Sequence, residues 1–457
     1  MAVASVYPTY CNSGLAWIPK LPEGWQVLRN GRLFGHRVEM GFPDLPILEV
    51  SLRTGVRVRD MENLKRKQAI SQKEKYKRAT KGDIAYNMMR MWQGAVGPAP
   101  VDGLVSPAYV VVKPYAEANS TYYSYLFRTA AYMQEVNKYS RGIVADRNRL
   151  YWESFKQMPS LVPPRPEQDQ IVAYLRAQDV HIARFIKAKR DLIKLLTEQK
   201  LRIIDHAVTR GLDASVALKP SGIEWLGDVP VNWEVRRLKF LASNTTSQTT
   251  TKARDEIYLA MEHVQSWTGV ARPLEGEVEF ASTVKRFVVD DVLFGKLRPY
   301  LAKVTRAKCN GVCVSEFLVL RSRKEFILPA YLEQMLRCKR VIDLINSSTA
   351  GAKMPRADWI FIGNVRLPVP CKDVQEAILS HIESETKDLG EAITRTEDEI
   401  KLIREYRDRL ITDVVTGQVD VRGWQPGPED VVEDAVLAAL GDDQEEMTEK
   451  EDDDDED

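Results

Sequence analysis

The chain has 457 residues, 44% of them hydrophobic, which predicts about three packed globular units and excludes a low-complexity polymer. Its formal net charge of zero hides an uneven distribution, because residues 429–457 hold 16 Asp and Glu against Lys450 alone. The remaining body carries 15 more Lys and Arg than Asp and Glu, which favours a polyanionic partner, although excess Lys can also be only solubilising.

Neither a targeting segment nor a disulfide framework is expected. The N-terminus has no basic start followed by an apolar run, and no stretch approaches the ~18 apolar residues that a membrane span needs. We therefore expect a cytoplasmic protein without membrane contact. The five cysteines are scattered, so reduced thiols are predicted. Cys309 and Cys313 have no nearby Cys or His to complete a metal site, which favours buried or incidental cysteine.

The first globular domain is predicted over residues 1–165. Ile47 to Val50 and Tyr109 to Val112 read as strands and Tyr122 to Tyr139 as a helix, which together indicate an α+β domain. Residues 57–83 are dense in Lys and Arg. They form either a solvated helix face or a surface that follows DNA phosphates, and the sequence favours neither.

A long helix is predicted next, over residues 166–212, because apolar residues return every three or four positions without an internal Gly. Near-heptad spacing indicates a coiled-coil seam, and Phe185 and Leu192 fall on the same spacing. The predicted seam of this helix comprises Ile171, Leu175, Ile182, Leu196 and Ile203. His181 and His206, which lie in this helix, are interpreted as packing or surface residues.

The second half of the chain repeats the first. Residues 13–27, SGLAWIPKLPEGWQV, return at 221–235 as SGIEWLGDVPVNWEV, and residues 191–213 return from Asp398 as DEIKLIREYRDRLITDVVTGQVD. Two tryptophans around a proline-containing turn predict a clamp between each domain's start and its core. The repeat predicts a second globular domain over 213–370.

The repeat also predicts a second long helix over 371–417, able to pair with the first in an antiparallel coiled coil. The seam predicted for this helix comprises Ile378, Ile382, Leu389, Ile403 and Leu410. Residues 418–457 are predicted to be an acidic disordered tail. For this tail a solubilising role is preferred to competition with DNA for the basic surface.

The candidate DNA-binding residues are cations, with one tryptophan, in polar or Gly-rich segments of both domains, where phosphates and base edges can be reached. They include the ends of the loop 243–254, SNTTSQTTTKAR, and the segment pairs in which Arg90 matches Arg298 and Arg147 matches Arg356. The candidates are Arg57, Arg59, Lys65, Lys67, Lys75, Lys77, Arg78, Arg90, Trp92, Arg147, Lys252, Arg254, Lys296, Arg298, Lys353 and Arg356.

Recognisable catalytic motifs are missing. The sequence has no GxxxxGK[ST] loop, no GxGxxG after a strand, no HExxH and no Cys-x-x-Cys pair, and its five histidines are dispersed. We therefore predict no catalytic residue and no metal ligand.

Several of these segments together resemble the specificity subunits of type I restriction–modification enzymes. They are the doubled SGxxWxxxxPxxW, the helix start PPRPEQDQIVAYL, the helix ends AVTRG and VVTGQ, and GKLRPYLAKV at 295–304. The resemblance covers about residues 13–423. It implies an α+β architecture of two target recognition domains separated by two long antiparallel helices, each domain reading one half of a bipartite, gapped sequence in double-stranded DNA.

The resemblance also implies a non-catalytic chain that binds no cofactor. Its partners would be two modification (methyltransferase) subunits, which methylate adenine with S-adenosylmethionine, and restriction subunits that use ATP and Mg²⁺ for translocation and cleavage in host defence. Two alternatives stay open: a coiled-coil scaffold that binds no DNA, and a self-sufficient methyltransferase or nuclease, against which the missing motifs weigh.

Overall fold

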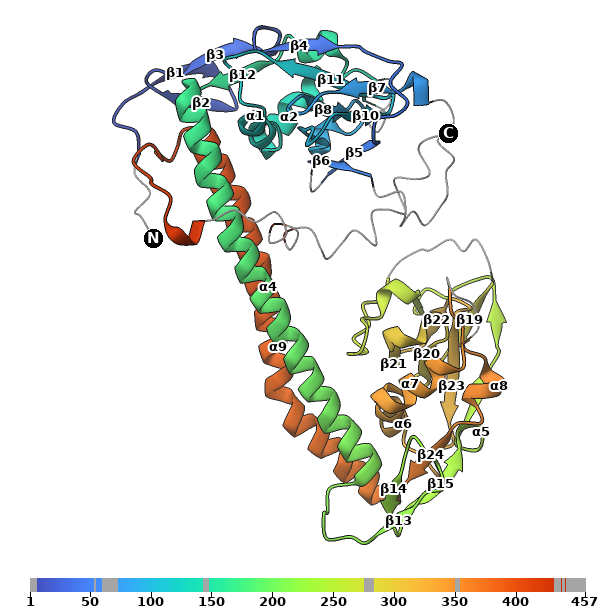
Figure 1. Cartoon of the computed structure of the whole chain (residues 1–457). Helices are drawn as coiled ribbons and strands as arrows, with labels where there is room; N and C mark the ends of the chain where they lie inside the picture. The colour runs from blue at the N-terminus through green and yellow to red at the C-terminus, as the bar shows by residue number, and fades with distance from the viewer. Residues whose placement is uncertain are drawn as a thin grey trace. The chain divides into compact units, whose positions relative to one another are not determined.

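The chain forms two compact units, described here from a computed structural model (Figure 1). The structure describes residues 6–52, 55–59, 73–142, 148–274, 283–349, 354–430, 437 and 440. The first unit comprises Met1–Arg190 with Glu397–Asp457, and the second comprises Asp191–Thr396. Each unit therefore combines one globular part with a portion of two long helices.

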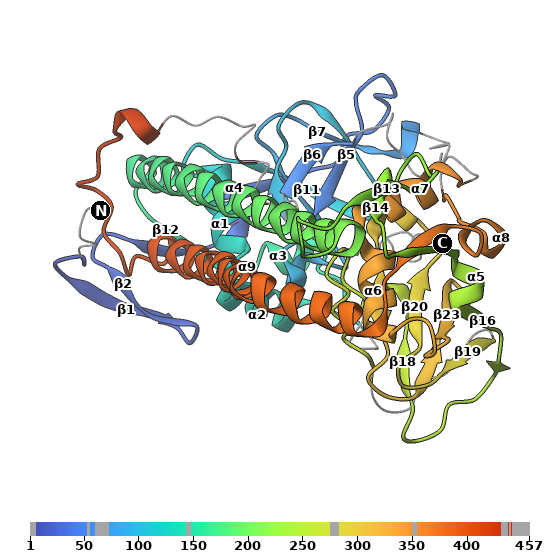
Figure 2. The same cartoon turned by 90° about the horizontal axis from the view of Figure 1, so that it is seen from below.

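The two long helices are α4 (Arg165–Arg210) and α9 (Lys372–Val415), which lie side by side in Figures 1 and 2. Their direction follows from ion pairs in the first unit, where Asp179 and Lys189 of α4 meet Arg407 and Glu399 of α9. Residue numbers rise along one helix as they fall along the other, so the predicted antiparallel pairing is confirmed.

The seam is confirmed in part. Ile171, Leu175, Ile182, Ile378, Ile382 and Leu410 are buried, and Leu196, Ile203, Leu389 and Ile403 are half-buried. Phe185 and Leu192 are each 39% exposed, whereas Ile186 is fully buried. An α-helix has 3.6 residues per turn, so a strict seven-residue spacing drifts around it, and the buried position moves by one residue here.

A four-stranded antiparallel sheet forms the centre of the first globular part, in the order β4-β11-β8-β9. Its strands are β4 (Phe34–Arg37), β8 (Ile84–Asn87), β9 (Val96–Pro98) and β11 (Tyr109–Pro114). Strand pairs surround it: β1 (Tyr10–Leu15) with β2 (Ile18–Pro22), β3 (Gln26–Arg29) with β12 (Pro159–Val162), β5 (Leu48–Ser51) with β6 (Gly55–Val58), and β7 (Lys77–Ala79) with β10 (Gly103–Val105). The strands expected at 47–50 and 109–112 are therefore present.

The helix expected over 122–139 is two helices, α1 (Ser120–Phe127) and α2 (Ala130–Tyr139). Thr129 interrupts them because its extended backbone and hydroxyl cap the start of α2, accepting a hydrogen bond from the Tyr132 amide. A short helix α3 (Trp152–Phe155) follows. Aromatic side chains of these helices, among them Tyr123 and Phe127, pack around Phe34 in a fully buried core.

The second globular part repeats this sheet, in the order β16-β23-β20-β21. The strands are β16 (Ala242–Thr245), β20 (Val292–Gly295), β21 (Val304–Arg306) and β23 (Phe317–Ser322). The register repeats as well, since the pair Ile84–Val112 of the first sheet corresponds to Val292–Leu320 of the second. A sequence repeat of 208 positions thus reproduces individual strand pairings.

The remaining elements of the second part follow the same plan. They are β13 (Leu218–Pro220) with β14 (Asp228–Pro230), β15 (Glu234–Arg237) with β24 (Arg366–Val369), the sheet of β17 (Gln248–Thr249), β19 (Val284–Phe287), β22 (Gly311–Cys313) and β18 (Ile257–Leu259), and the helices α5 (Leu238–Leu241), α6 (Pro329–Arg337), α7 (Lys339–Ser347) and α8 (Trp359–Ile362). The stretch 243–254, expected to be one loop, contains β17 and most of β16, because Asn244 and Thr245 pair with β23.

Two equivalent glutamines fix the start of each long helix to its globular part. The fully buried Gln168 accepts a hydrogen bond from the Asn119 amide and donates to the carbonyls of Glu117 and Pro163. Gln375 makes the same three contacts with Leu328, Phe326 and Pro370. A buried amide with all these groups paired holds one helix orientation.

The tryptophan clamps also occur twice. Trp25 and Trp233 are buried, 5% and 3% exposed. Each packs against the glycine that ends a long helix, Trp25 against Gly417 after α9 and Trp233 against Gly211 after α4. Both glycines have positive φ (73° and 78°), the left-handed conformation that commonly terminates helices, and glycine adopts it without strain.

Residues 418–430 are ordered, which corrects their assignment to a disordered tail. Val421 is buried in the first core, and Trp424 meets the ring of Tyr174 on α4 edge-on. The short turn η7 (Pro428–Asp430) follows. Of residues 431–457, the structure describes Leu437 and Leu440 alone.

Candidate nucleic-acid interface

The candidate cations of the first unit lie on several elements, and most of those described have internal partners. Arg57 and Arg59 both form ion pairs with Glu49 across the β5–β6 hairpin. Arg78 pairs with Glu39 and Asp102 and lies over the ring of Phe42. These carboxylates offset part of the positive charge, so the 57–83 segment is less uniformly cationic than its sequence.

Lys77 faces inward as well. Its ammonium donates to the carbonyls of Pro107 and Tyr109, and burial lowers its pKa. Lys75 is exposed and has no ion pair among the described residues. Lys65, Lys67, Arg147 and Lys353 fall outside the described residues.

Trp92 is a packing residue. It lies in the short turn η3 (Met91–Gln93), contacts the first core and donates its indole N–H to the Met89 carbonyl. Its neighbour Arg90 begins the same turn, half-buried. A stacking role for this indole would require it to leave these contacts, so Arg90 is the better candidate of the two.

The second unit gathers three of its candidates on two adjoining segments. The Ala357 amide donates to the Lys296 carbonyl at 2.9 Å, and the Arg298 amide donates to Pro355 at 2.8 Å. Arg298 and Arg356 are thereby neighbours in the fold. We call residues 296–298 with 355–357 the paired loops of the second unit.

Arg298 holds an uncommon backbone conformation, with φ 49° and ψ 62°, at the start of η6 (Pro299–Leu301). For a residue with a side chain this left-handed region is strained and is found disproportionately at functional sites. Lys296 is half-exposed, Tyr300 is 43% exposed, and Arg356 pairs with Glu316 at 3.2 Å. The paired loops therefore bring three cations together, and the exposed Tyr300 follows two residues after Arg298.

One of these two backbone contacts recurs at equivalent positions of the first unit. The Leu150 amide donates to the Met88 carbonyl at 2.9 Å, which matches the Ala357–Lys296 contact. This alignment makes Arg149, rather than Arg147, the counterpart of Arg356, because α3 and α8 start with Trp152 and Trp359 at the same distance beyond it. Residues 88–90 with 148–150 are the paired loops of the first unit.

The sequence comparison missed Arg149, although a signal was available. Trp152 and Trp359 are 207 positions apart, the shift of the helix repeat, and aligning them places Arg149 on Arg356. Pairing Arg147 with Arg356 requires a shift of 209 positions, two more than the 207 that aligns the tryptophans. The sequence comparison therefore misaligned this loop by two residues.

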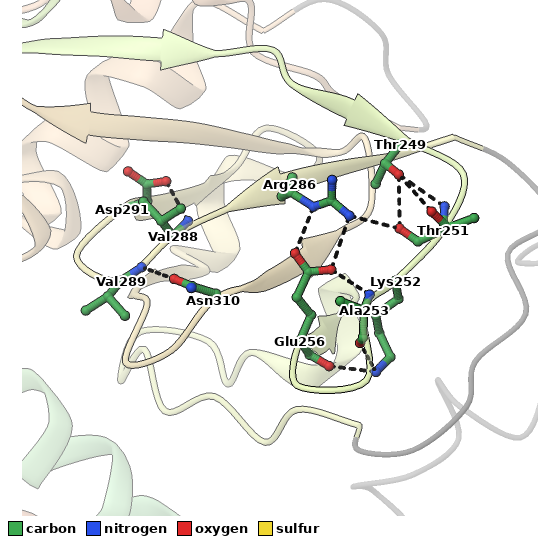
Figure 3. A network of polar contacts seen from close by, with 10 residues as sticks. All are labelled: Thr249, Thr251, Lys252, Ala253, Glu256, Arg286, Val288, Val289, Asp291 and Asn310. Carbon is green, nitrogen blue, oxygen red and sulfur yellow. Dashed lines mark hydrogen bonds and ion pairs between the residues drawn. The ribbon is translucent and has the colours of Figure 1, made fainter.

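Lys252 and Arg254 lie on a loop fixed by its own polar contacts (Figure 3). Glu256 accepts from the Ala253 amide at 2.8 Å and from Arg286 at 2.8 Å. Burial raises the pKa of the Glu256 carboxyl, but these donors outweigh it and lower the pKa overall. Lys252 turns back to the carbonyls of Glu256 and Ala253, which leaves Arg254 exposed.

A buried aspartate directly precedes the equivalent strand of each unit, Asp83 before β8 and Asp291 before β20. Asp83 accepts from the Thr80 amide and pairs with Arg37 of β4 at 2.6 Å. Asp291 accepts from the Val288 amide and pairs with Arg321 of β23 at 2.8 Å. Both units thus have an aspartate at this position, but the arginine that pairs with it comes from β4 in the first unit and from β23 in the second. These carboxylates are therefore structural.

In the described part of the chain, no three His, Cys, Asp or Glu side chains are grouped to hold a metal ion. All five cysteines are free thiols. The described helices include none that is long and apolar enough to cross a membrane.

Comparisons with known proteins agree with the resemblance found in the sequence. Over 161 residues the chain is 24% identical to the specificity subunit of the type I restriction enzyme EcoDI from Escherichia coli, an alignment that spans 35% of this chain and only 36% of that protein. No known family model matches the chain.

Solved structures extend the likeness in fold. A chain from a structure concerned with assembly and conformational transition of the type I R-M system covers 87% of this chain and 99% of its own length, with 13% identity and a TM-score of 0.57. The HsdS subunit from Thermoanaerobacter tengcongensis aligns with 16% identity, 87% and 98% coverage and a TM-score of 0.38. The first of these establishes the shared fold, so the predicted architecture is confirmed.

Proposed function

We propose that this chain is the DNA sequence-recognition subunit of a type I restriction–modification system. Each globular part reads one half of a bipartite, gapped target in double-stranded DNA. The observation that carries this proposal is the repeat itself: two sheets share strand order and register, while the paired loops in front of them differ in sequence. Two equivalent sheets that carry different loops are well suited to recognise two different half-sites.

The charge distribution supports duplex DNA as the ligand. Arg90 and Arg149 in the first unit correspond to Arg298 and Arg356 in the second, and guanidinium groups serve both phosphate contact and bidentate recognition of guanine. A scaffold that binds no DNA would not require arginines at equivalent positions of both paired loops. It is therefore the second candidate, without an observation that favours it.

Catalysis is assigned to partner subunits. In this proposal two modification subunits use S-adenosylmethionine to methylate adenine, restriction subunits use ATP and Mg²⁺, and this chain binds none of these cofactors. The long helices offer two equivalent contact points for the modification subunits. Leu195 of α4 and Leu402 of α9 match in the repeat and are each 62% exposed.

These leucines give a test of partner docking. When a partner covers an exposed apolar side chain of this size, the complex is stabilised by about 1.5–3 kcal/mol for complete burial. We expect Leu195→Glu or Leu402→Glu to reduce the number of bound modification subunits from two to one, and the double variant to abolish binding. Native mass spectrometry of the copurified complex measures this, with Thr394→Glu, a change on an exposed side chain of α9, as control. Two bound subunits in all variants would reject these docking points.

The decisive experiment for recognition is selection from a randomised duplex pool by the chain copurified with its modification subunits. We expect the retained duplexes to share a two-part motif with a fixed gap. If a folded complex enriches no motif, the scaffold function is the correct one.

A further inference from the structure

A basic groove of about 1850 Å³ lies within the first unit, between the globular part and the two long helices. Nine Lys or Arg and four Asp line it. The four aspartates all pair with lining arginines, for example Asp83 with Arg37 and Asp179 with Arg407. The groove therefore has an excess of positive charge.

Part of this charge has no intramolecular counterion. Lys81, Lys113 and Arg176 line the groove, are exposed and form no ion pair with any residue that the structure describes. Arg409 on α9 also lines it and is 84% exposed, with Asp413 at 3.5 Å. These four cations come from the globular part and from both helices, so one extended polyanion could contact all of them.

The acidic C-terminal stretch starts from a fixed point on α4, one of the two helices that line this groove. His181 Nε2 and Asp430 Oδ1 are 2.6 Å apart, and Arg184 donates to the Glu429 carbonyl at 2.8 Å. Further back, Gln170 donates to the Trp424 carbonyl at 2.6 Å. These contacts hold residues 424–430 on the helix that also carries Arg176.

Two residues of the following segment lie in the groove. Leu437 and Leu440 are among its lining residues. Residues 441–457 come next and hold 12 Asp and Glu against Lys450. Seventeen residues reach up to roughly 55–60 Å when extended. Charge, tether and position thus agree on one occupant.

We propose that residues 441–457 occupy this groove as an intramolecular polyanion, which DNA must displace before its phosphates reach the same cations. Tethering gives such a segment a millimolar effective concentration, so it competes with weakly held DNA and yields to a specific site that binds more tightly. The docking rests on the contacts above, whereas its competition with DNA also rests on the proposed function.

Docking is tested without DNA. The probe is a labelled synthetic peptide of residues 441–457, titrated into the full-length chain whose 12 acidic residues in this stretch are replaced by Asn and Gln. We expect saturable binding that weakens at least tenfold between 50 and 200 mM salt, because each cation pairing releases counterions. No saturable binding would overturn the proposal, whether or not the pool selection finds a motif.

Matched variants locate the peptide. Arg176→Glu with Arg409→Glu is expected to weaken peptide binding at least tenfold. Arg202→Glu with Arg395→Glu makes the same charge change at exposed positions of the same two helices outside the groove, and is expected to have little effect. If both double variants weaken peptide binding equally, the peptide responds only to the total charge of the chain. That result would reject the groove as its binding site.

Competition is tested with a duplex that lacks the selected motif. Neutralising the 12 acids in the full-length chain is expected to tighten binding of this duplex about tenfold at 50 mM salt, and the groove variant is expected to cancel the gain. Unchanged DNA affinity despite peptide docking would overturn the competition. Peptide docking in a complex that selects no DNA motif would instead reject the recognition function and keep the docking.

Discussion

At the residue scale, two buried glutamines show how a repeated sequence produces a repeated joint. Gln168 and Gln375 are each 0% exposed. Each side chain hydrogen-bonds to one backbone amide and two backbone carbonyls of its globular part. Without the glutamine those groups would be buried with no partner, which costs about 1–3 kcal/mol for each group. The joint is therefore specific to the amide, and an apolar side chain of equal length cannot replace it.

We predict that Gln168→Met destabilises the first unit, and Gln375→Met the second, by about 2 kcal/mol or more, because methionine keeps the volume and makes none of the three hydrogen bonds. Urea unfolding followed by hydrogen exchange in each unit measures this. Gln199→Met, at an exposed position of α4, is the control and should change stability by less than about 0.5 kcal/mol. If Gln168→Met changes stability no more than the control does, water must replace the hydrogen bonds of the glutamine.

Glu256 is the second residue whose substitution has a defined outcome. Its carboxylate joins the Ala253 amide to Arg286 and shapes the loop that carries Arg254. Because the folded pKa lies below the ordinary value of 4.5, the carboxylate stabilises the loop above that pH and loses this effect as pH falls through the folded pKa. Glu256→Gln should therefore speed amide exchange of residues 251–256 at neutral pH. An unchanged exchange rate would assign the loop's order to its backbone alone.

At the element scale, the antiparallel helices are joined by a buried ion pair. Asp179 is 6% exposed and accepts from Arg407 at 2.6 Å and from the Tyr125 hydroxyl at 2.8 Å. Burial acts against the charge on Arg407, but Asp179 raises its pKa above the usual value. One carboxylate thus links α4, α9 and α1.

We predict that Asp179→Leu costs about 3–5 kcal/mol, because it leaves the largely buried Arg407 with only the exposed Asp408 carboxylate, 3.9 Å away, whereas Asp179→Leu with Arg407→Leu costs far less. A double-mutant cycle from denaturant unfolding gives the coupling energy. Lys189→Met breaks a more exposed pair with Glu399 on the same helices and should cost less than about 1 kcal/mol. Additive effects of the two leucines would contradict this account.

Elements were predictable from the sequence to the extent that local pattern determined them. The long helices followed from apolar spacing and the second sheet from the repeat. The break at Thr129 was missed, since an apolar run continues through it and only the hydroxyl cap interrupts the helix. Ion pairs such as Arg57–Glu49 could not be predicted either, because the sequence of a lysine-rich segment does not show which carboxylates lie against it in the fold.

At the scale of the whole molecule, two equivalent frames imply that half-site recognition is separable. Each pair of loops is fixed by backbone contacts within its own unit, as Leu150–Met88 and Ala357–Lys296 show. In the proposed function, Arg298 and Arg356 therefore contact DNA in one unit without contributing to the other. The sequence repeat could establish this symmetry, and it places Arg149 on Arg356 once Trp152 is aligned with Trp359.

We predict that Arg298→Ala with Arg356→Ala relaxes one half of the selected motif and leaves the other half and the gap unchanged. Arg90→Ala with Arg149→Ala should relax the opposite half. Removing one bidentate arginine–guanine pair should reduce discrimination at that base position by about 1–3 kcal/mol, or roughly fivefold to 150-fold. Repeating the pool selection with each double variant measures this, and Arg202→Ala, outside both pairs of loops, is the control. If a variant binds all duplexes more weakly but leaves both halves of the motif unrelaxed, these arginines bind phosphates rather than bases, because removing a phosphate interaction weakens binding to every sequence alike.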